Sequence, residues 1–354
     1  MAREYTVTVD PLGREVACRE DQTILDACLR AGVWVPHSCT HGTCGTCKAD
    51  LLSGDVDHGE ASGFALMDFE RDEGKLLLCQ ACPRGDITIE ADVEVDEDLR
   101  LSSVRDLTGT VVEIADLARD IRLVRIALDE PLQFAPGQYV SLRVPGSGAS
   151  RTYSMANPPS EDRLLELHIK RTDGGLASDG WVFSTMKVGE KVELSGPYGR
   201  FVFRRSRSEP VIMIAGGTGL APLLSMIRDV FSDPTSDHVI SLYQGARTRD
   251  DLYGFDELQA LAEQYPDRFH YHPCLSGGED VPGARTGRVT EVLGEDFPRC
   301  AGNVGYVCGP PGMVEDSMRL LMSRRLFPRN IYREDFFDES HKASGGLASP
   351  LIKR

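Results

Sequence analysis

Three cysteines stand close together in the segment SCTHGTCGTC, and a fourth follows at a distance. Cys39, Cys44 and Cys47 have the spacing C-x4-C-x2-C, and Cys79 lies 32 positions after Cys47. This is the plant-type spacing of the four thiolates that hold a 2Fe-2S cluster. Because four soft ligands must converge on two irons, the loop has to turn tightly, and its two glycines permit such turns. The motif therefore predicts a 2Fe-2S site.

A structural zinc site is the rival interpretation, since it also uses four cysteines. Zinc sites usually pair two C-x2-C units, and Cys79 and Cys82 supply a possible second one. A Rieske centre is excluded by the spacing, because His37 and His41 do not replace two of the cysteines in the required pattern. Cys82 could also be a thiol near the cluster, and small core residues are expected at Cys18, Cys28, Cys274 and Cys300.

A second group of residues has types that suit a flavin nucleotide. In RTYS, Arg151 offers a bidentate cation for a phosphate, Tyr153 an aromatic face, and Ser154 a hydroxyl. In HIKRTDGGLAS, Lys170 ends an expected strand, and Gly175 and Ser178 open an expected helix whose amides suit a pyrophosphate. Either motif alone is better explained by barrel packing and surface charge, whereas the two together, in this order, favour flavin binding.

A third group lies in the C-terminal half and suits a dinucleotide. The strand VIMIA runs into a glycine turn made of Gly216, Gly217, Thr218 and Gly219, and a helix follows. Such turns bring backbone amides and a helix dipole to phosphates. Near the end, YVCGPPGM repeats the arrangement and places Cys308 at the carboxyl edge of a sheet, although a buried structural cysteine is the simpler explanation of that motif alone.

The elements that must position these residues fall into three regions. The first has an alternating hairpin, a short helix and two more strands, which is typical of a small α+β domain: residues 3–9, 14–18, 21–32, 48–52 and 87–90. The second has short β-rich runs separated by turns, which predict an antiparallel barrel: 108–115, 121–128, 139–144 and 165–170. After Pro210, strands and helices alternate and predict a parallel sheet.

Length and charge limit the class of protein. The 354 residues suggest two or three domains. The formal charge is -16, and residues 1–100 hold 9 Lys+Arg against 21 Asp+Glu, which disfavours nucleic acid and anionic membrane as partners and suits docking on a basic protein surface. Simple solubility explains the acidic residues equally well. No apolar run is long enough to span a membrane, so a cytoplasmic protein with reduced thiols is expected.

Taken in order, the cysteine set, RTYS, GGTGLAP, CGPPGM and REDFF resemble the reductase components of bacterial multicomponent oxygenases. The resemblance covers nearly the whole chain and is nearest to reductases of phenol hydroxylases and other soluble diiron monooxygenases. It implies a β-grasp 2Fe-2S ferredoxin, an antiparallel β-barrel FAD domain and a Rossmann-like parallel-sheet NAD domain. The expected boundaries are 1–95 for the ferredoxin, 96–106 for a linker, 107–206 for the FAD domain, 207–340 for the NAD domain and 341–354 for a tail.

The resemblance also implies roles for residues. Arg151, Tyr153 and Ser154 would bind FAD, with Ser154 near the reactive flavin nitrogen, and Lys170, Gly175 and Ser178 would lie by the FAD pyrophosphate. The turn Gly216, Gly217, Thr218 and Gly219 would contact the nicotinamide dinucleotide, with Cys308 and Glu334 beside the nicotinamide and Phe336 or Phe337 shielding the flavin. The catalytic set would be Ser154, Cys308 and Glu334. For the nucleotide, Asp250 and Asp251 suit a free ribose, Arg247 or Arg249 would suit a 2'-phosphate, and the resemblance implies NADH.

Three functions are compared. The first is an NADH-dependent reductase that passes electrons through FAD and a 2Fe-2S cluster to the hydroxylase of a diiron monooxygenase. The second serves a Rieske ring-hydroxylating dioxygenase by the same chemistry. The third, from another class, is a zinc-stabilised binding protein with an unused nucleotide fold.

Overall fold

The computed structural model describes residues 2–38, 40, 42–93, 98 and 102–336. Two compact units make up the chain. The first holds the residues up to Arg105 together with Pro197–Arg200, and the second holds Asp106–Gly196 and Phe201–Phe336. Four of the predicted features fall partly or wholly outside the described residues: Cys39, Phe337, part of the linker 96–106 and the tail 341–354.

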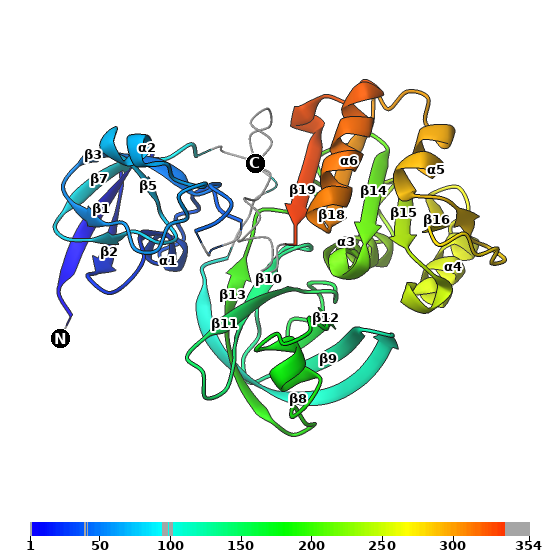
Figure 1. Ribbon diagram of the computed structural model, residues 1–354, viewed down its shortest axis with the longest axis horizontal. Coiled ribbons are helices and arrows are strands. Elements are labelled where there is room, and N and C mark those ends of the chain that lie inside the picture. Colours follow the sequence, from blue (N-terminus) through cyan, green and yellow to red (C-terminus); the bar gives the residue numbers. More distant parts are fainter. Residues whose placement is uncertain (1, 39, 41, 94–97, 99–101, 337–354) are drawn as a thin grey trace. The chain divides into compact units, whose positions relative to one another are not determined.

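The first unit is a five-stranded mixed sheet with a short helix beside it (Figure 1). Its strand order is β2-β1-β7-β3-β5, with β1 parallel to β7, and the other pairs antiparallel. The strands are β1 (Glu4–Asp10), β2 (Arg14–Arg19), β3 (Lys48–Ser53), β5 (Lys75–Leu77) and β7 (Ile87–Glu90), and β4 (Val56–Asp57) pairs separately with β6 (Cys82–Pro83). The expected hairpin is confirmed as β1 and β2.

Helix α1 (Ile24–Arg30) forms where the apolar spacing predicts it. Thr23 is the N-cap, because its side chain accepts a hydrogen bond from the Asp26 amide at 3.3 Å. Ile24, Leu25, Ala27, Cys28 and Leu29 are buried. A second, shorter helix, α2 (Asp68–Asp72), follows the cysteine loop and packs near β5.

The second unit begins with a six-stranded sheet of order β11-β10-β13-β8-β9-β12. The strands are β8 (Arg105–Ala118), β9 (Ile121–Leu128), β10 (Tyr139–Arg143), β11 (Ser150–Ser154), β12 (Leu164–Lys170) and β13 (Lys191–Tyr198). The pairs β8/β9, β9/β12 and β10/β11 are antiparallel, as expected. Buried side chains of these strands form one apolar cluster that includes Val124, Leu142 and Leu167.

The predicted antiparallel barrel forms as an antiparallel sheet that does not close in the residues that the structure describes. The edge strands β11 and β12 share only an isolated bridge, between Met155 and Leu167. One reason is the Asn157 side chain, which forms hydrogen bonds with backbone groups at the start of β12 that a neighbouring strand would otherwise use. Its amide nitrogen donates to the Leu164 carbonyl at 2.6 Å, and its oxygen accepts from the Glu166 amide at 2.9 Å. The antiparallel sheet therefore stays open.

The second unit ends with a six-stranded parallel sheet of order β17-β16-β15-β14-β18-β19. Its strands are β14 (Val211–Gly216), β15 (Ile240–Ala246), β16 (Phe269–Leu275), β17 (Arg285–Thr286), β18 (Val304–Gly309) and β19 (Ile331–Asp335). Every residue of β14 and β18 is buried, which is why these strands are continuously apolar in sequence. The predicted alternation of strands and helices is confirmed.

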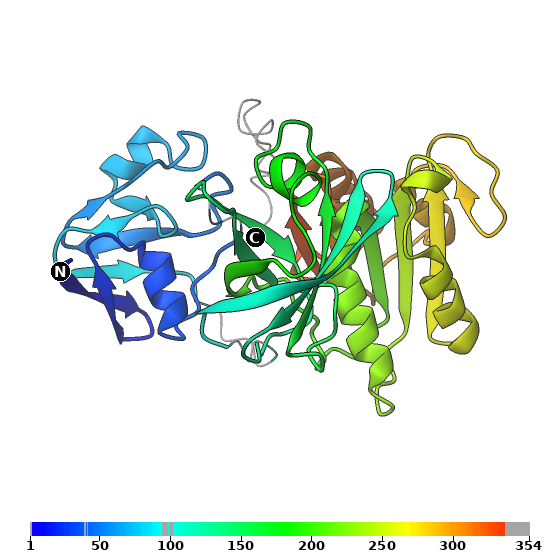
Figure 2. The same cartoon turned by 90° about the horizontal axis from the view of Figure 1, so that it is seen from below.

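Helices cover both faces of this parallel sheet. Figure 2 shows α3 and α4 in front of it and α5 and α6 behind. They are α3 (Leu220–Ser232), α4 (Phe255–Gln264), α5 (Val289–Asp296) and α6 (Pro311–Ser323), and single turns occur at η1 (Ser178–Val182), η2 (Gly217–Gly219), η3 (Arg249–Asp251) and η4 (Pro328–Asn330). No helix in the described part of the chain is both long and apolar enough to span a bilayer.

Candidate cofactor sites

The cysteine loop brings together those of the four predicted ligands that the structure describes. Cys44, Cys47 and Cys79 are 8%, 4% and 5% exposed. The Cys79 side chain lies within hydrogen-bonding reach of Cys47, and this contact, together with burial and the nearby Cys44, raises the pKa of Cys47. Thiols that crowd one another in this way become stable as thiolates only when a cation binds them, so the site fits a metal cluster.

The backbone of the loop turns at its glycines, as predicted. Gly42 and Gly45 have φ of 74° and 72°, in the left-handed region that favours glycine. A Cβ on Gly42 would lie 2.7 Å from the Gln80 side chain. The Thr46 amide donates to the Cys44 sulfur at 3.5 Å, which is the kind of bond that tunes a thiolate ligand.

The zinc interpretation needs Cys79 and Cys82 to act together as a second C-x2-C unit, but the two have different neighbours. Cys79 lies against Cys47, whereas Cys82 is half-buried on β6, where it interacts with Cys18. Among the described residues, no group of three or more His, Cys, Asp or Glu side chains could hold a single metal ion. A 2Fe-2S cluster places two cysteines on each iron, and Cys39 lies outside the described residues.

All four residues of the RTYS motif lie on β11. Arg151 and Tyr153 project to one side of the strand and Ser154 to the other, because side chains alternate. Burial raises the pKa of Tyr153 to about 12, and Ser154 is buried. The Arg151 guanidinium donates to the Ser150 carbonyl at 2.9 Å. The structure thus places a cation, a ring and a hydroxyl together on one strand, a set that fits a flavin nucleotide.

Lys170 is the last residue of β12, as predicted, and its ammonium lies 3.4 Å from the Asp120 carboxylate. The expected helix after Gly175 is only the single turn η1. The Ser178 hydroxyl accepts a hydrogen bond from the Thr172 amide at 3.1 Å. A Cβ on Gly175 would lie 2.7 Å from that hydroxyl, so glycine is required for this close turn.

The glycine turn after β14 and the Cys308 motif come together at one edge of the parallel sheet. Ala215 and Cys308 are register partners in β14 and β18. A Cβ on Gly219 would overlap the Cys308 carbonyl, and one on Gly216 would lie 2.5 Å from the Met313 sulfur. Gly217 has φ of 53°. These three glycines, with Thr218 between them, therefore let two strand ends approach where α/β proteins bind ligands.

Glu334 completes this edge, since it is the register partner of Cys308 in β19. Its carboxyl is buried, and Oε2 has no hydrogen-bond partner among the described residues. Burial, reinforced by the nearby Asp335, raises the pKa of Glu334 to about 8. Burial also raises the pKa of the Cys308 thiol. At neutral pH the edge therefore carries a protonated acid and a neutral thiol, both of which can donate hydrogen bonds.

Phe336 follows β19 directly. Its amide donates to the Gly309 carbonyl at 3.0 Å, and its partly buried ring packs against the core of the second unit. Phe337, the other candidate for shielding the flavin, lies outside the described residues.

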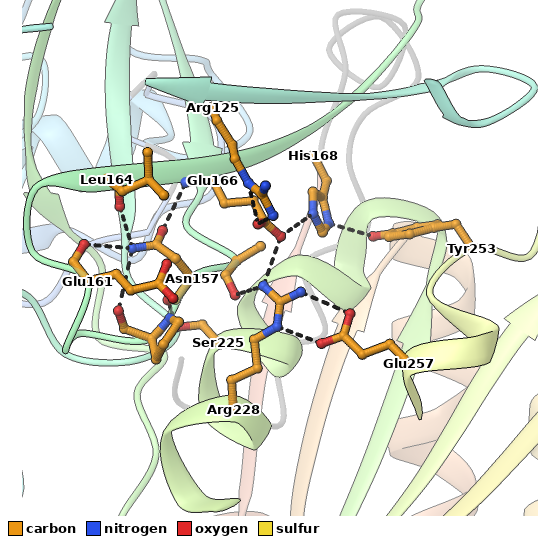
Figure 3. Close-up of polar contacts among 12 residues, drawn as sticks. Arg125, Asn157, Glu161, Leu164, Glu166, His168, Ser225, Arg228, Tyr253 and Glu257 are labelled. Carbon is orange, nitrogen blue, oxygen red and sulfur yellow. Dashed lines mark hydrogen bonds and ion pairs between the residues drawn. The ribbon is translucent and has the colours of Figure 1, made fainter. Parts of the chain in front are cut away.

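One feature of the second unit was missed by sequence reasoning: a buried polar network around Glu166 and His168 (Figure 3). The Glu166 carboxylate accepts hydrogen bonds from Arg125 at 2.7 Å and from Arg228 of α3 at 2.8 Å. His168 lies 3.0 Å from Glu166 and 3.3 Å from the Tyr253 hydroxyl. The signal was present in LELHIK, where the polar residues Glu166, His168 and Lys170 alternate with apolar ones.

This network joins the antiparallel sheet to the parallel-sheet region. Arg228 also donates to the Ala156 carbonyl at 3.1 Å and pairs with Glu257 of α4, while the Ser225 hydroxyl of α3 donates to the Asn157 carbonyl at 2.7 Å. Burial opposes ionisation of Glu166, but His168 and Arg228 outweigh it and lower the pKa of this carboxyl. The network thus holds β12 and α3 in a fixed relation.

Comparison with known proteins gives the same three parts. Residues 7–84 match the 2Fe-2S iron-sulfur cluster binding domain, 108–203 the oxidoreductase FAD-binding domain, and 213–319 the oxidoreductase NAD-binding domain. The chain is 44% identical to a phenol hydroxylase P5 protein of Acinetobacter pittii, over 99% of both chains. It is 46% identical to the reductase subunit of an aromatic O-demethylase of Amycolatopsis, over 94% of this chain and 98% of the relative.

Solved structures agree. A crystal structure of an Amycolatopsis cytochrome P450 reductase is 45% identical, with a TM-score of 0.87 over 94% of this chain and 98% of the other. The ferredoxin reductase of a carbazole 1,9a-dioxygenase is 26% identical, with a TM-score of 0.82 over 95% and 100%. The domain order, the assembled site residues and the identity over the full length lead to one conclusion: the chain belongs to the family of FAD- and NAD-binding 2Fe-2S reductase components of multicomponent oxygenases.

Proposed function

We propose that this protein is the NADH-oxidising reductase of a soluble diiron monooxygenase of the phenol hydroxylase type. The observation that carries the proposal is the 44% identity to phenol hydroxylase reductase components over 99% of both chains. When bound, FAD takes a hydride from NADH and releases single electrons through the 2Fe-2S cluster, so the pair is split for a one-electron acceptor. The protein binds and orients these groups.

Different residues of the chain bind the cluster, FAD and NADH. Cys39, Cys44, Cys47 and Cys79 hold the cluster, and Arg151, Tyr153, Ser154, Lys170, Gly175 and Ser178 hold FAD. The turn Gly216–Gly219 admits the NADH phosphates. Cys308 and the protonated Glu334 donate hydrogen bonds beside the nicotinamide, and Phe336 or Phe337 covers the flavin until the nicotinamide arrives.

The choice of NADH over NADPH follows the family, and in the loop after β15 it is supported at Arg249 alone, since Arg247 is exposed there. A 2'-phosphate needs an available arginine. The Arg249 guanidinium stacks on Phe255 at 4.7 Å and donates to the Leu252 carbonyl at 3.2 Å, while Asp250 is exposed in the same turn. We expect kcat/KM to be higher with NADH by at least about tenfold. Equal or better turnover with NADPH would contradict this choice.

A second candidate partner is supported by an equally strong likeness. The Amycolatopsis structure at 45% identity is described as a cytochrome P450 reductase. Purified reductase should therefore be combined separately with a diiron hydroxylase of the phenol type, a cytochrome P450 and a Rieske dioxygenase, with NADH consumption and hydroxylated product measured together. The proposal predicts coupled turnover with the diiron hydroxylase, and coupling only to the cytochrome P450 or the Rieske enzyme would replace it.

The proposal also covers the cellular location of the protein and the class of its partner. None of the nine described cysteines forms a disulfide, which suits a reducing cytoplasm. The acidic charge suits a protein partner and opposes nucleic acid or an anionic membrane. Fractionation of cells that express the chain tests both points, since we expect it in the cytoplasmic fraction without bound nucleic acid.

A further inference from the structure

An exposed apolar surface adjoins the cysteine loop in the first unit. Phe64, Met67 and Phe69, called here the Phe64 surface, are 69%, 47% and 58% exposed. They are three of the nine large hydrophobic side chains that stand exposed in the described ranges, and they occur within six consecutive positions. Scattered apolar side chains are ordinary on a surface, whereas a group of them marks an interaction site.

The backbone that carries the Phe64 surface is attached directly to the loop between the cysteines. The Ser62 amide donates to the Gly42 carbonyl at 3.0 Å. Ala65 is buried, and its carbonyl oxygen lies 3.4 Å from where a Cβ on Gly45 would be. Phe64 is therefore the immediate neighbour of a residue that packs on the C-x4-C-x2-C loop.

The same segment is held in place on its other side. The Lys48 ammonium lies 2.5 Å from one Glu70 oxygen, and the Met67 amide donates to the other at 2.9 Å. Leu66, between the exposed residues, is fully buried. The apolar side chains thus project from a fixed backbone. Binding a partner here therefore costs this segment little backbone entropy.

Exposed acidic residues flank the Phe64 surface along the chain. Glu60, Asp68 and Asp72 are exposed, and none of them forms an ion pair within the described part of the chain. The only arginine or lysine between residues 55 and 74 is Arg71, whose guanidinium donates to the Ala61 carbonyl at 3.1 Å. An apolar centre with aromatic and methionine side chains inside a charged rim is the usual anatomy of a protein interface.

We propose that the Phe64 surface is the docking site for the protein that takes electrons from the cluster, and that this partner presents an apolar patch ringed by lysine or arginine. The inference rests on the proposed function. Electrons cross only short gaps between proteins, so an acceptor has to dock beside the cysteine loop. The acidic rim steers a basic partner to this place, and the aromatic centre then holds it.

The test compares a protein acceptor with a small one. Cytochrome c, a basic haem protein, serves as the protein acceptor and ferricyanide as the small one, with rates divided by cluster content from visible absorption. The double variant Phe64→Ser/Phe69→Ser should lower kcat/KM for cytochrome c about tenfold and leave ferricyanide reduction unchanged. The matched control is Phe327→Ser, since Phe327 is 62% exposed in the second unit.

A loss for cytochrome c of less than threefold, or an equal loss in the Phe327→Ser control, overturns the proposal. So does a dimeric wild type that becomes monomeric in the double variant, because the Phe64 surface would then bind a second copy. The variant Glu60→Gln/Asp68→Asn should weaken the dependence of the cytochrome c rate on ionic strength, and an unchanged dependence removes the role of the rim. A wild type that reduces ferricyanide but no protein acceptor refutes the proposed function instead.

Discussion

Among single residues, Glu334 has a strongly perturbed environment at the edge of the parallel sheet. Its carboxyl is buried, and Oε2 lacks a hydrogen-bond partner among the residues described. An ionised carboxylate in that position would carry a large desolvation cost, so the acid keeps its proton and its pKa rises to about 8. A neutral acid beside a dinucleotide can donate a hydrogen bond, which a carboxylate cannot.

This shift predicts how stability depends on pH. Because the folded pKa lies above the unfolded one, Glu334 stabilises the fold fully below about pH 4.5 and loses this effect as pH rises through about 8. Between these values its contribution falls by about 1.4 kcal/mol per pH unit. Urea unfolding at pH 6 and pH 8 should show a larger loss for the wild type than for Glu334→Gln. Equal losses in the two proteins would show that Glu334 titrates normally.

Gly219 gives a second prediction for a single residue. A Cβ there would overlap the Cys308 carbonyl, which is backbone and cannot rotate away. Gly219→Ala should therefore displace the end of β18, lower stability by about 2 kcal/mol and raise KM for NADH. Gly312→Ala is the matched control, since a Cβ there meets nothing within 4 Å. Steady-state kinetics and thermal unfolding of both variants decide the point, and the account fails if the two behave alike.

Among the elements, the contact of β12 with α3 depends on the Glu166 network. Removing Arg228 takes one of two arginines from the buried Glu166 carboxylate, which keeps only Arg125, and it leaves the Ala156 carbonyl without this donor. Arg228→Ala should thus cost about 3 kcal/mol of unfolding free energy. Arg143→Ala removes a pair with Glu193 whose side chains are 63% and 62% exposed, and it should cost less than about 1 kcal/mol. Similar losses in the two variants, measured by urea unfolding, would show that the network adds nothing.

The sequence predicted elements better than it predicted how they meet. The hairpin, α1, β12 and the glycine turn after β14 follow from apolar spacing and turn residues, which act locally. The open edge of the antiparallel sheet could not be predicted from local patterns. It depends on hydrogen bonds that the Asn157 side chain forms with the backbone of Leu164 and Glu166. The pairing of Glu166 with Arg228 was hidden for the same reason, since it joins residues 62 positions apart.

For the candidate sites the same distinction applies. Spacing alone predicts the cysteine ligands, because a cluster imposes its geometry on the loop that holds three of them. Cys308 and Glu334 become neighbours only through the register of β18 and β19, which no local pattern encodes. Their assignment before the structure came from resemblance to a family.

At the scale of the whole molecule, we expect separate parts of the chain to carry separate tasks. Cys44→Ser should remove the cluster absorption and abolish transfer to a protein acceptor, because Cys44 is a proposed ligand of the cluster in the first unit. NADH-driven reduction of ferricyanide should continue, since the residues proposed to hold FAD and NADH lie in the second unit. Loss of ferricyanide reduction in a folded, flavin-loaded variant would show that the tasks are not separate. Cys300→Ser, at a buried cysteine of the second unit, is the control.

The central claim is that electrons from NADH reach a 2Fe-2S cluster through a bound flavin. Its most direct test is the visible spectrum of the purified wild type, with metal and flavin analysis, before and after anaerobic addition of NADH. The account predicts about two irons and one FAD per chain, with flavin and cluster bands that both bleach. A colourless protein that contains zinc and no flavin, or a cluster that NADH leaves oxidised, would contradict it.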